Sequence, residues 1–253
     1  MIRKRRLKTR RLKKSRKRHE KNLFYGFKKY RDGSSLVSEA LVLCTESGEN
    51  IRRKKLELFK EIITGANRAG NVTVRSYGIQ NIPKDQSFMY FPNHQGLYDV
   101  LALLDGSPYF FSVVMKKELE HLPFLNLIFR IMGAHSMDRE DVRQSMKVIQ
   151  KVSQEVKDGK NFLIFPEGTR SKNPKEIGSF KGGSFKSATK ARCPIVPVCI
   201  KDADRVFDTG STAPVTVEVH YLKPLYYEEY EKMKTTEIAE EVEKRIQKAL
   251  NEK

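Results

Sequence analysis

The sequence lacks the short motifs that supply a nucleophile or a catalytic metal in many hydrolases. It contains no G-x-S-x-G nucleophile elbow and no H-E-x-x-H metal-binding pair. Its three cysteines, Cys44, Cys193 and Cys199, fit neither the spacing of metal ligands nor a pattern of disulfide pairs. We therefore expect no metal and no cofactor, and any enzymatic chemistry must come from other residues.

Long apolar runs are also absent. The longest apolar segments are residues 35–44, which Glu39 interrupts, and residues 122–134, which Arg130 interrupts. Neither reaches the roughly 18–20 apolar residues that a membrane-spanning helix needs. Because no apolar leader is recognisable and the cysteines show no pairing pattern, we expect a reducing, cytosolic setting and no transmembrane helix.

Acidic residues are scarce in the first 31 residues, where one glutamate stands against 16 lysines and arginines. The remaining 222 residues carry 33 basic and 30 acidic side chains, so +15 of the net charge of +18 belongs to this arm and +3 to the rest. A segment so rich in like charge and so poor in apolar residues cannot bury a core of its own. Residues 1–31 are therefore predicted to form a disordered arm with an anionic partner.

Two kinds of anionic partner fit this arm. Nucleic acid is one, because runs of lysine and arginine bind phosphates. Anionic lipid is the other, because the aromatic residues of 23–31 lie among cations, as is typical of a headgroup interface, although this segment would also fit simple packing against the body. Since the nearly neutral body carries no recognition-helix or base-stacking motif, we do not expect nucleic-acid binding to be the main function.

The rest of the chain divides into a helical segment and an α/β domain. Apolar residues between 51 and 66 recur at helical spacing, which predicts a helical N-terminal segment over residues 32–70, and the glycine-containing stretch 65–71 marks the expected start of the main domain at 71–253. Strands are predicted at 72–77, 87–91, 109–115, 161–165, 194–200 and 215–221, and helical spacing appears near 142–158 and 238–249. This alternation predicts a mixed, largely parallel β-sheet flanked by helices.

One histidine stands near a carboxylate directly after a predicted strand. His94 and Asp99 belong to the sequence N-H-Q-G-L-Y-D at 93–99. A histidine paired with a carboxylate is a usual general base near neutral pH. Because the chain offers no nucleophile motif, we expect this base to deprotonate a hydroxyl of a bound substrate. Asp99 would accept the Nδ1–H of His94 and leave Nε2 to take the proton.

Cationic candidates follow the neighbouring predicted strands. Lys116 comes directly after the strand at 109–115, and Arg170 lies in P-E-G-T-R-S at 166–171, after the strand at 161–165. Reactive residues of α/β sheets collect beyond the carboxyl ends of the strands, so these loops should lie near His94. The two cations could hold a phosphate, and Arg170 could do so through a forked contact. A phosphorylated alcohol would then be the acceptor of an activated acyl group.

In combination these blocks resemble the glycerolipid acyltransferases, and in particular the bacterial 1-acyl-glycerol-3-phosphate (lysophosphatidic acid) acyltransferases. Over roughly residues 72–222 the blocks follow the order of that family: N-H-x4-D, K-K-E-L-E-H-L-P, G-A-H-S-M-D-R, F-P-E-G-T-R-S with F-K-G-G-S, and C-P-I-V-P-V. The resemblance implies transfer of a fatty acyl group from acyl-CoA or acyl-carrier-protein to the free hydroxyl of 1-acyl-glycerol-3-phosphate, giving phosphatidic acid. It also implies work at a membrane surface without a metal.

The resemblance assigns roles by matched position. His94 resembles the general base and Asp99 its orienting partner. Three cations match the phosphate-contacting residues of the family: Lys116, Arg139 and Arg170. The segment that matches the acceptor site consists of Glu167, Gly168 and Thr169. Many members of the family begin with membrane-embedded helices, whereas this chain begins with a basic arm. We therefore expect peripheral attachment at the cytoplasmic face of the cell membrane.

Several alternatives stay open at this point. Arg139 follows Asp138, so a local ion pair competes with phosphate binding. Glu167 fits either contact with the acceptor or bracing of its loop through backbone N–H groups. The acceptor itself could be glycerol-3-phosphate or another lysolipid, with the same chemistry.

Overall fold

The structure is a computed structural model that describes residues 48–121, 123–171, 173, 176–207 and 213–252. The basic arm predicted at 1–31 and the first part of the helical segment predicted at 32–70 lie outside these residues. The first described helix is α3 (Glu49–Gly70), which contains the predicted apolar stripe. It continues beyond that stripe to Gly70 and is capped by Asn71, whose backbone is left-handed (φ 52°) and leads into the first strand.

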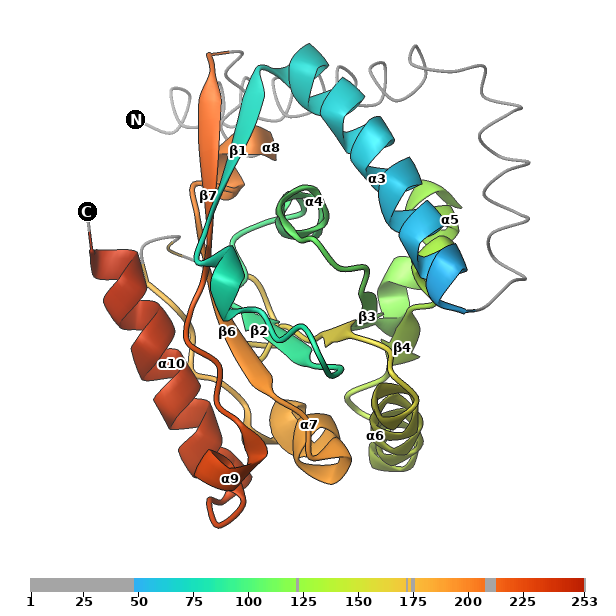
Figure 1. Ribbon diagram of the computed structural model, residues 1–253, viewed down its shortest axis with the longest axis vertical. Coiled ribbons are helices and arrows are strands. Elements are labelled where there is room, and N and C mark those ends of the chain that lie inside the picture. Colours follow the sequence, from blue (N-terminus) through green and yellow to red (C-terminus); the bar gives the residue numbers. More distant parts are fainter. Residues whose placement is uncertain (1–47, 122, 172, 174–175, 208–212, 253) are drawn as a thin grey trace, which may run out of the picture.

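Seven strands of the described chain form one sheet (Figure 1). Their bounds are β1 (Val72–Tyr77), β2 (Met89–Pro92), β3 (Ser112–Lys116), β4 (His135–Met137), β5 (Phe162–Leu163), β6 (Ile195–Lys201) and β7 (Val215–Tyr221). The strand order is β1-β7-β6-β2-β5-β3-β4. All neighbours in the part β6-β2-β5-β3-β4 pair in parallel. Strand β7 runs antiparallel to β6, and β1 pairs in parallel with β7. The predicted mixed, largely parallel sheet is confirmed.

Helices cover both faces of the sheet (Figure 1). One face carries α3, α4 (Asp99–Gly106) and α5 (Pro123–Met132), and the other carries α6 (Val142–Lys157), α7 (Lys186–Ala191) and α10 (Thr235–Asn251). The shorter helical elements are η1 (Ile79–Asn81), η2 (Lys117–His121), η3 (Gly182–Phe185), α8 (Asp204–Phe207) and α9 (Tyr227–Tyr230). Among the described helices, none is both long and apolar enough to cross a bilayer.

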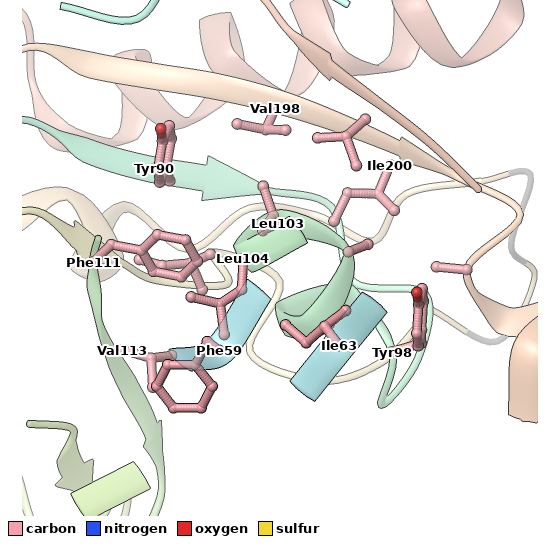
Figure 2. Packing of buried hydrophobic residues seen from close by; sticks show 14 of the residues in the cluster. Phe59, Ile63, Tyr90, Tyr98, Leu103, Leu104, Phe111, Val113, Val198 and Ile200 are labelled. Atoms are coloured by element: carbon pink, nitrogen blue, oxygen red, sulfur yellow. The ribbon is translucent and has the colours of Figure 1, made fainter. Parts of the chain in front are cut away.

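The central strands are apolar on both sides because each side meets a layer of helices. In β2, Tyr90 packs in the cluster under α3 and α4, whereas Met89 and Phe91 pack in the cluster under α6, α7 and α10. Figure 2 shows the first of these clusters, where Leu103 and Leu104 of α4 lie between the sheet and α3. Helix α3 therefore packs on the same core as the sheet, and its apolar stripe is core.

Two predicted strands are shorter than expected, and one strand was missed. The strand predicted at 109–115 begins only at Ser112, and the one predicted at 161–165 is ordered as β5 over two residues. The short strand β4 was not predicted. It has only three residues, all half-buried, and it pairs with β3 alone at the edge of the sheet, so its sequence carries little strand pattern.

Candidate active site

The predicted site residues follow four neighbouring parallel strands. His94 follows β2, the segment 166–171 follows β5, Lys116 ends β3, and Arg139 follows β4. Because these strands run in parallel, their carboxyl ends meet at one edge of the sheet. The loops with Lys116 and Arg170 were predicted to lie at the same edge as His94, and the strand order agrees with this; Arg139 follows the next strand at that edge.

His94 and Asp99 form a direct pair. The Nδ1 atom of His94 lies 2.7 Å from Oδ2 of Asp99, whose side chain is fully buried, while the His94 side chain is 20% exposed. The backbone N–H groups of Gln95 and Gly96 also donate to Oδ2, at 2.8 and 3.0 Å. The imidazole stacks on Phe165 with 4.0 Å between the ring centroids. Since Asp99 accepts only, it selects the tautomer with Nδ1–H and leaves Nε2 as the basic nitrogen.

The loop that carries His94 is anchored to the end of β6. The buried side chain of Asn93 accepts from the backbone N–H of Ile200 at 2.7 Å and donates to the carbonyl of Ile200 at 3.0 Å. The side chain of Asn93 thereby adds two hydrogen bonds to β6 just beyond the last backbone pair between β2 and β6. Gln95, also buried, accepts from the backbone N–H of Ala203 at 3.0 Å. His94 therefore stands between two anchored neighbours, so its backbone position is well defined.

Glu167 ties the His94 loop to the loop after β5. Its buried carboxylate accepts from the backbone N–H of His94 at 2.7 Å and from that of Gly178 at 2.8 Å. Burial raises the pKa of Glu167, and the two N–H donors oppose this shift. A second bond between the loops runs from the backbone N–H of Ser171 to the carbonyl of His94, at 2.9 Å. Of the two alternatives for Glu167, these bonds support the bracing of the loop.

Arg139 lies against Gly168, where the loop needs a left-handed residue. The backbone of Gly168 has φ +74°, and its carbonyl accepts a hydrogen bond from Nη1 of Arg139. A Cβ atom at Gly168 would lie 2.5 Å from the same nitrogen. The carboxylate of Asp138 instead pairs with Nζ of Lys117 at 3.3 Å. Within the described residues Arg139 and Asp138 form no ion pair, so the local ion pair that was left open as an alternative to phosphate binding does not form.

The remaining candidates are more exposed. Lys116 pairs with Glu118, with 3.0 Å between Nζ and Oε1, and both side chains are more than half exposed, so the pair contributes little to stability. Arg170 is half-buried and makes no hydrogen bond or ion pair with the described part of the chain, while Thr169 is exposed. The fold thus bonds His94 to both Asp99 and Glu167, sets Arg139 on Gly168, and leaves Lys116 and Arg170 along the same edge.

Three residues of this site were missed by sequence reasoning. Asn93, Gln95 and Phe165 all stand inside or beside the quoted motifs, but their partners are distant in sequence or in another motif. The available signals were the polar character of Asn93 and Gln95 next to the proposed base, and the place of Asn93 and Phe165 in the quoted motifs. No cluster of three or more histidine, cysteine, aspartate or glutamate residues suited to a metal ion occurs in the part of the chain that the structure describes.

Comparisons with known proteins point to one family. The family model described as Acyltransferase matches residues 73–201, which is half of the chain and contains all the site residues named above. The chain is 33% identical to a chloroplastic 1-acyl-sn-glycerol-3-phosphate acyltransferase of Brassica napus over 59% of this chain and 44% of that protein. It is 31% identical to the 1-acyl-sn-glycerol-3-phosphate acyltransferase of Saccharomyces cerevisiae over 71% of this chain and 60% of that protein.

A bacterial relative also belongs to this group of named proteins, and a solved structure shares the fold. A 1-acyl-sn-glycerol-3-phosphate acyltransferase of Borreliella burgdorferi is 30% identical over 64% of this chain and 66% of its own length. The chain thus spans between about two fifths and two thirds of the curated relatives described here. The crystal structure of the 1-acyl-sn-glycerophosphate acyltransferase PlsC from Thermotoga maritima shares the fold, with a TM-score of 0.74 at 24% identity over 93% of this chain and 96% of that chain.

Proposed function

The chain belongs to the acyltransferase family, and from this premise we propose that it acylates 1-acyl-glycerol-3-phosphate to give phosphatidic acid. The acyl group would come from acyl-CoA or acyl-carrier-protein. The observation that carries the proposal is the His94–Asp99 pair, in which Nδ1 of His94 lies 2.7 Å from Oδ2 of Asp99. The pair lies at the carboxyl ends of the parallel strands, where Lys116 ends its strand and Arg139 and Arg170 follow theirs. The names of the similar proteins support the acceptor.

The proposed reaction needs only one base on the protein. Nε2 of His94 takes the proton of the acceptor hydroxyl as its oxygen attacks the thioester carbonyl. A new C–O bond forms, the C–S bond breaks, and the imidazolium returns the proton to the leaving thiolate. Asp99 stabilises the imidazolium while it exists, and it holds the ring so that Nε2 points away from the carboxylate.

The cations have a proposed role in placing the acceptor. Lys116, Arg139 and Arg170 would hold the phosphate, so that the free hydroxyl is presented to His94 and much of the barrier is met by orientation. The strands β2 and β3 are two spacings apart, roughly 10 Å, which long lysine and arginine side chains can span. Because Nη1 of Arg139 bonds to Gly168, its remaining N–H groups are available to a phosphate in a fixed orientation.

Attachment to the membrane is proposed for the basic arm, which lies outside the described residues. Each lysine or arginine near an anionic surface contributes about 1 kcal/mol of binding, and this contribution falls with salt. Deletion of residues 1–22 should weaken binding to vesicles that contain anionic lipid and leave the rate on detergent-dispersed substrate unchanged. Equal vesicle binding with and without the arm would reject peripheral attachment through it.

The test of the function is a panel of acceptors with one labelled acyl thioester. The panel holds 1-acyl-glycerol-3-phosphate, glycerol-3-phosphate, a lysophospholipid with a larger headgroup and a phosphate-free lyso-ornithine lipid, and the labelled products are separated as lipids. We expect phosphatidic acid as the main product. If the main product comes from glycerol-3-phosphate, that compound is the acceptor and the proposed acceptor is wrong. If only the phosphate-free lipid is acylated, the proposed role of the cations in phosphate binding is wrong.

A further inference from the structure

One buried amide touches both ends of the helix that carries Asp99. Asn67 lies in the last turns of α3, and its Oδ1 accepts a hydrogen bond from the hydroxyl of Tyr98 at 2.5 Å. Its Nδ2 donates to Oδ2 of Asp105 at 3.3 Å. Tyr98 immediately precedes Asp99 at the start of α4, and Asp105 lies at the end of that helix. Asn67 thus joins the start and the end of α4 to α3.

The surroundings fix the direction of these bonds. Burial raises the pKa of the Tyr98 phenol far above its ordinary value, and the nearby carboxyl of Asp105 raises it further, so the hydroxyl stays protonated and donates. The oxygen of Asn67 must then face Tyr98, and its NH₂ group faces Asp105. Burial also raises the pKa of Asp105, while Lys60 of α3 opposes this shift. The Tyr98 hydroxyl and both ends of the Asn67 amide therefore each have a defined partner.

Helix α4 needs such an attachment because it is short. It has eight residues, and its buried face consists mainly of Ala102, Leu103 and Leu104, which lie between α3 and the sheet (Figure 2). Apolar contacts are non-directional, so they set the distance of a helix from its neighbours more firmly than its rotation. Hydrogen bonds are directional, and a bond at each end of α4 fixes the rotation as well. The rotation of α4 decides where the carboxylate of Asp99 lies.

We infer that Asn67 is a positioning residue for the His94–Asp99 pair, which it holds in register by fixing both ends of α4. The inference rests on the proposed function, in which this pair removes the proton of the acceptor hydroxyl. Asn67 precedes residue 73, where the match to the family model begins, so this contact joins the helix before the matched region to the reacting centre. It adds to the anchors that Asn93 and Glu167 provide from the other sides.

The consequence for the rate follows from the geometry of the pair. The bond of 2.7 Å between His94 and Asp99 is near its optimum, and a displacement of the order of 1 Å in the reacting groups costs roughly 100-fold in rate. Loss of the Asn67 contacts should therefore lower kcat about 10- to 100-fold. KM for both substrates should stay unchanged, because the hydrogen bonds of Asn67 run to Tyr98 and Asp105 and not to the cations proposed to hold the phosphate.

Three variants test this inference. Asn67→Leu removes both hydrogen bonds at similar volume, and Tyr98→Phe removes one of them with little change in packing; both should lower kcat and leave KM unchanged. Combining Asn67→Asp with Asp105→Asn exchanges amide and carboxylate, so that both bonds can form again, and this pair should keep kcat within about threefold of the wild type. If Asn67→Leu does not fold, Tyr98→Phe and the exchanged pair decide.

Asn161 offers a matched control. Its side chain also bridges two segments, accepting from the N–H of Phe88 and donating to the carbonyl of Phe110, both at 3.2 Å, but at the opposite end of the strands from His94. Asn161→Leu should lower Tm and leave kcat unchanged. If Asn67→Leu and Tyr98→Phe fold and keep the wild-type kcat, or if Asn161→Leu lowers kcat equally, Asn67 has no special role.

A second readout separates this inference from the proposed function. The Nδ1–H proton of His94, held by Asp99, should give a resolved downfield signal in the proton NMR spectrum, and Tyr98→Phe should move or broaden it. This measurement needs no turnover. If the wild type transfers no acyl group but the signal responds to Tyr98→Phe, the proposed function fails and the positioning role stands. An unchanged signal in both Tyr98→Phe and Asn67→Leu would overturn the positioning role.

Discussion

Replacement of Asp99 by asparagine tests the pair with almost no change of shape. The carboxylate is fully buried, and Oδ2 accepts from Nδ1 of His94 and from the backbone N–H groups of Gln95 and Gly96. If the amide oxygen takes the place of Oδ2, these bonds persist but the negative charge is lost. If the NH₂ group takes that place, it faces three donors and forces His94 into the tautomer that carries its proton on Nε2. In either orientation the imidazolium loses its stabilisation.

The expected loss of rate is large because loss of the negative charge and a change of the His94 tautomer each raise the free energy of the transition state. In the serine protease triad, the corresponding aspartate-to-asparagine change lowers kcat by about 10⁴. We expect Asp99→Asn to lower kcat by roughly 10³–10⁴, which corresponds to about 4–5.5 kcal/mol of barrier at 1.36 kcal/mol per tenfold change. KM for the acceptor should change little, since the cations that would hold its phosphate are untouched.

The assay is the initial rate of phosphatidic acid formation at saturating donor and acceptor, with thermal unfolding of each variant as the measure of folding. Asp99→Asn should remain folded, because at most a few of the buried bonds lose a partner. A folded Asp99→Asn protein with kcat within threefold of the wild type would refute the role of the carboxylate. A rise in KM at constant kcat would place Asp99 in substrate binding instead.

Three further predictions concern the surroundings of the pair. Asn93→Ala leaves the backbone groups of Ile200 unpaired in a buried position, so the free energy of unfolding should fall by about 2–4 kcal/mol; equal denaturant midpoints would contradict this. In Gly168→Ala the new methyl group meets a left-handed backbone and the guanidinium of Arg139, so the variant should be destabilised by about 1–2 kcal/mol. Its KM for the acceptor should also rise. An unchanged KM would show that this loop takes no part in acceptor binding. Burial lowers the pKa of His135 from its ordinary value of 6.5, so the contribution of the neutral imidazole to stability is complete above pH 6.5 and is lost as the pH falls through the lower folded-state value. Between pH 7 and 5 the wild type should therefore lose more free energy of unfolding than His135→Gln. Parallel plots of unfolding free energy against pH for the two proteins would contradict this.

The outline of the fold was predictable because each long strand has a clear local pattern. The alternating run at 215–221 and the strand at 72–77 appear as β7 and β1 with the predicted bounds. The parallel arrangement then placed His94, Lys116 and Arg170 at one edge without any knowledge of contacts. The helix that ends near Asp158 was predicted in the same way, from the helical spacing of its apolar residues.

Long-range pairing was not predictable, since a single sequence does not reveal which distant groups meet. Asn93 bonds to Ile200, which is 107 residues away, and Asn67 bonds to Tyr98 across 31 residues. Asn93 belongs to the N-H-x4-D motif and Asn67 to no motif, but in neither case does the sequence show the distant partner. A local ion pair with Arg139 was one of two open alternatives for Asp138, but the structure pairs Asp138 with Lys117, because β3 and β4 run side by side and bring η2 to the turn after β4.

The central claim is that His94 takes the proton of the acceptor hydroxyl. The most direct measurement compares the rate of phosphatidic acid formation by the wild type with that of His94→Gln, with 1-acyl-glycerol-3-phosphate and an acyl thioester at saturation. We expect the wild type to form phosphatidic acid and His94→Gln to lose about 10²–10⁴-fold in kcat while it stays folded. A folded His94→Gln protein that keeps the wild-type kcat, or a wild type that forms no phosphatidic acid, would contradict the account.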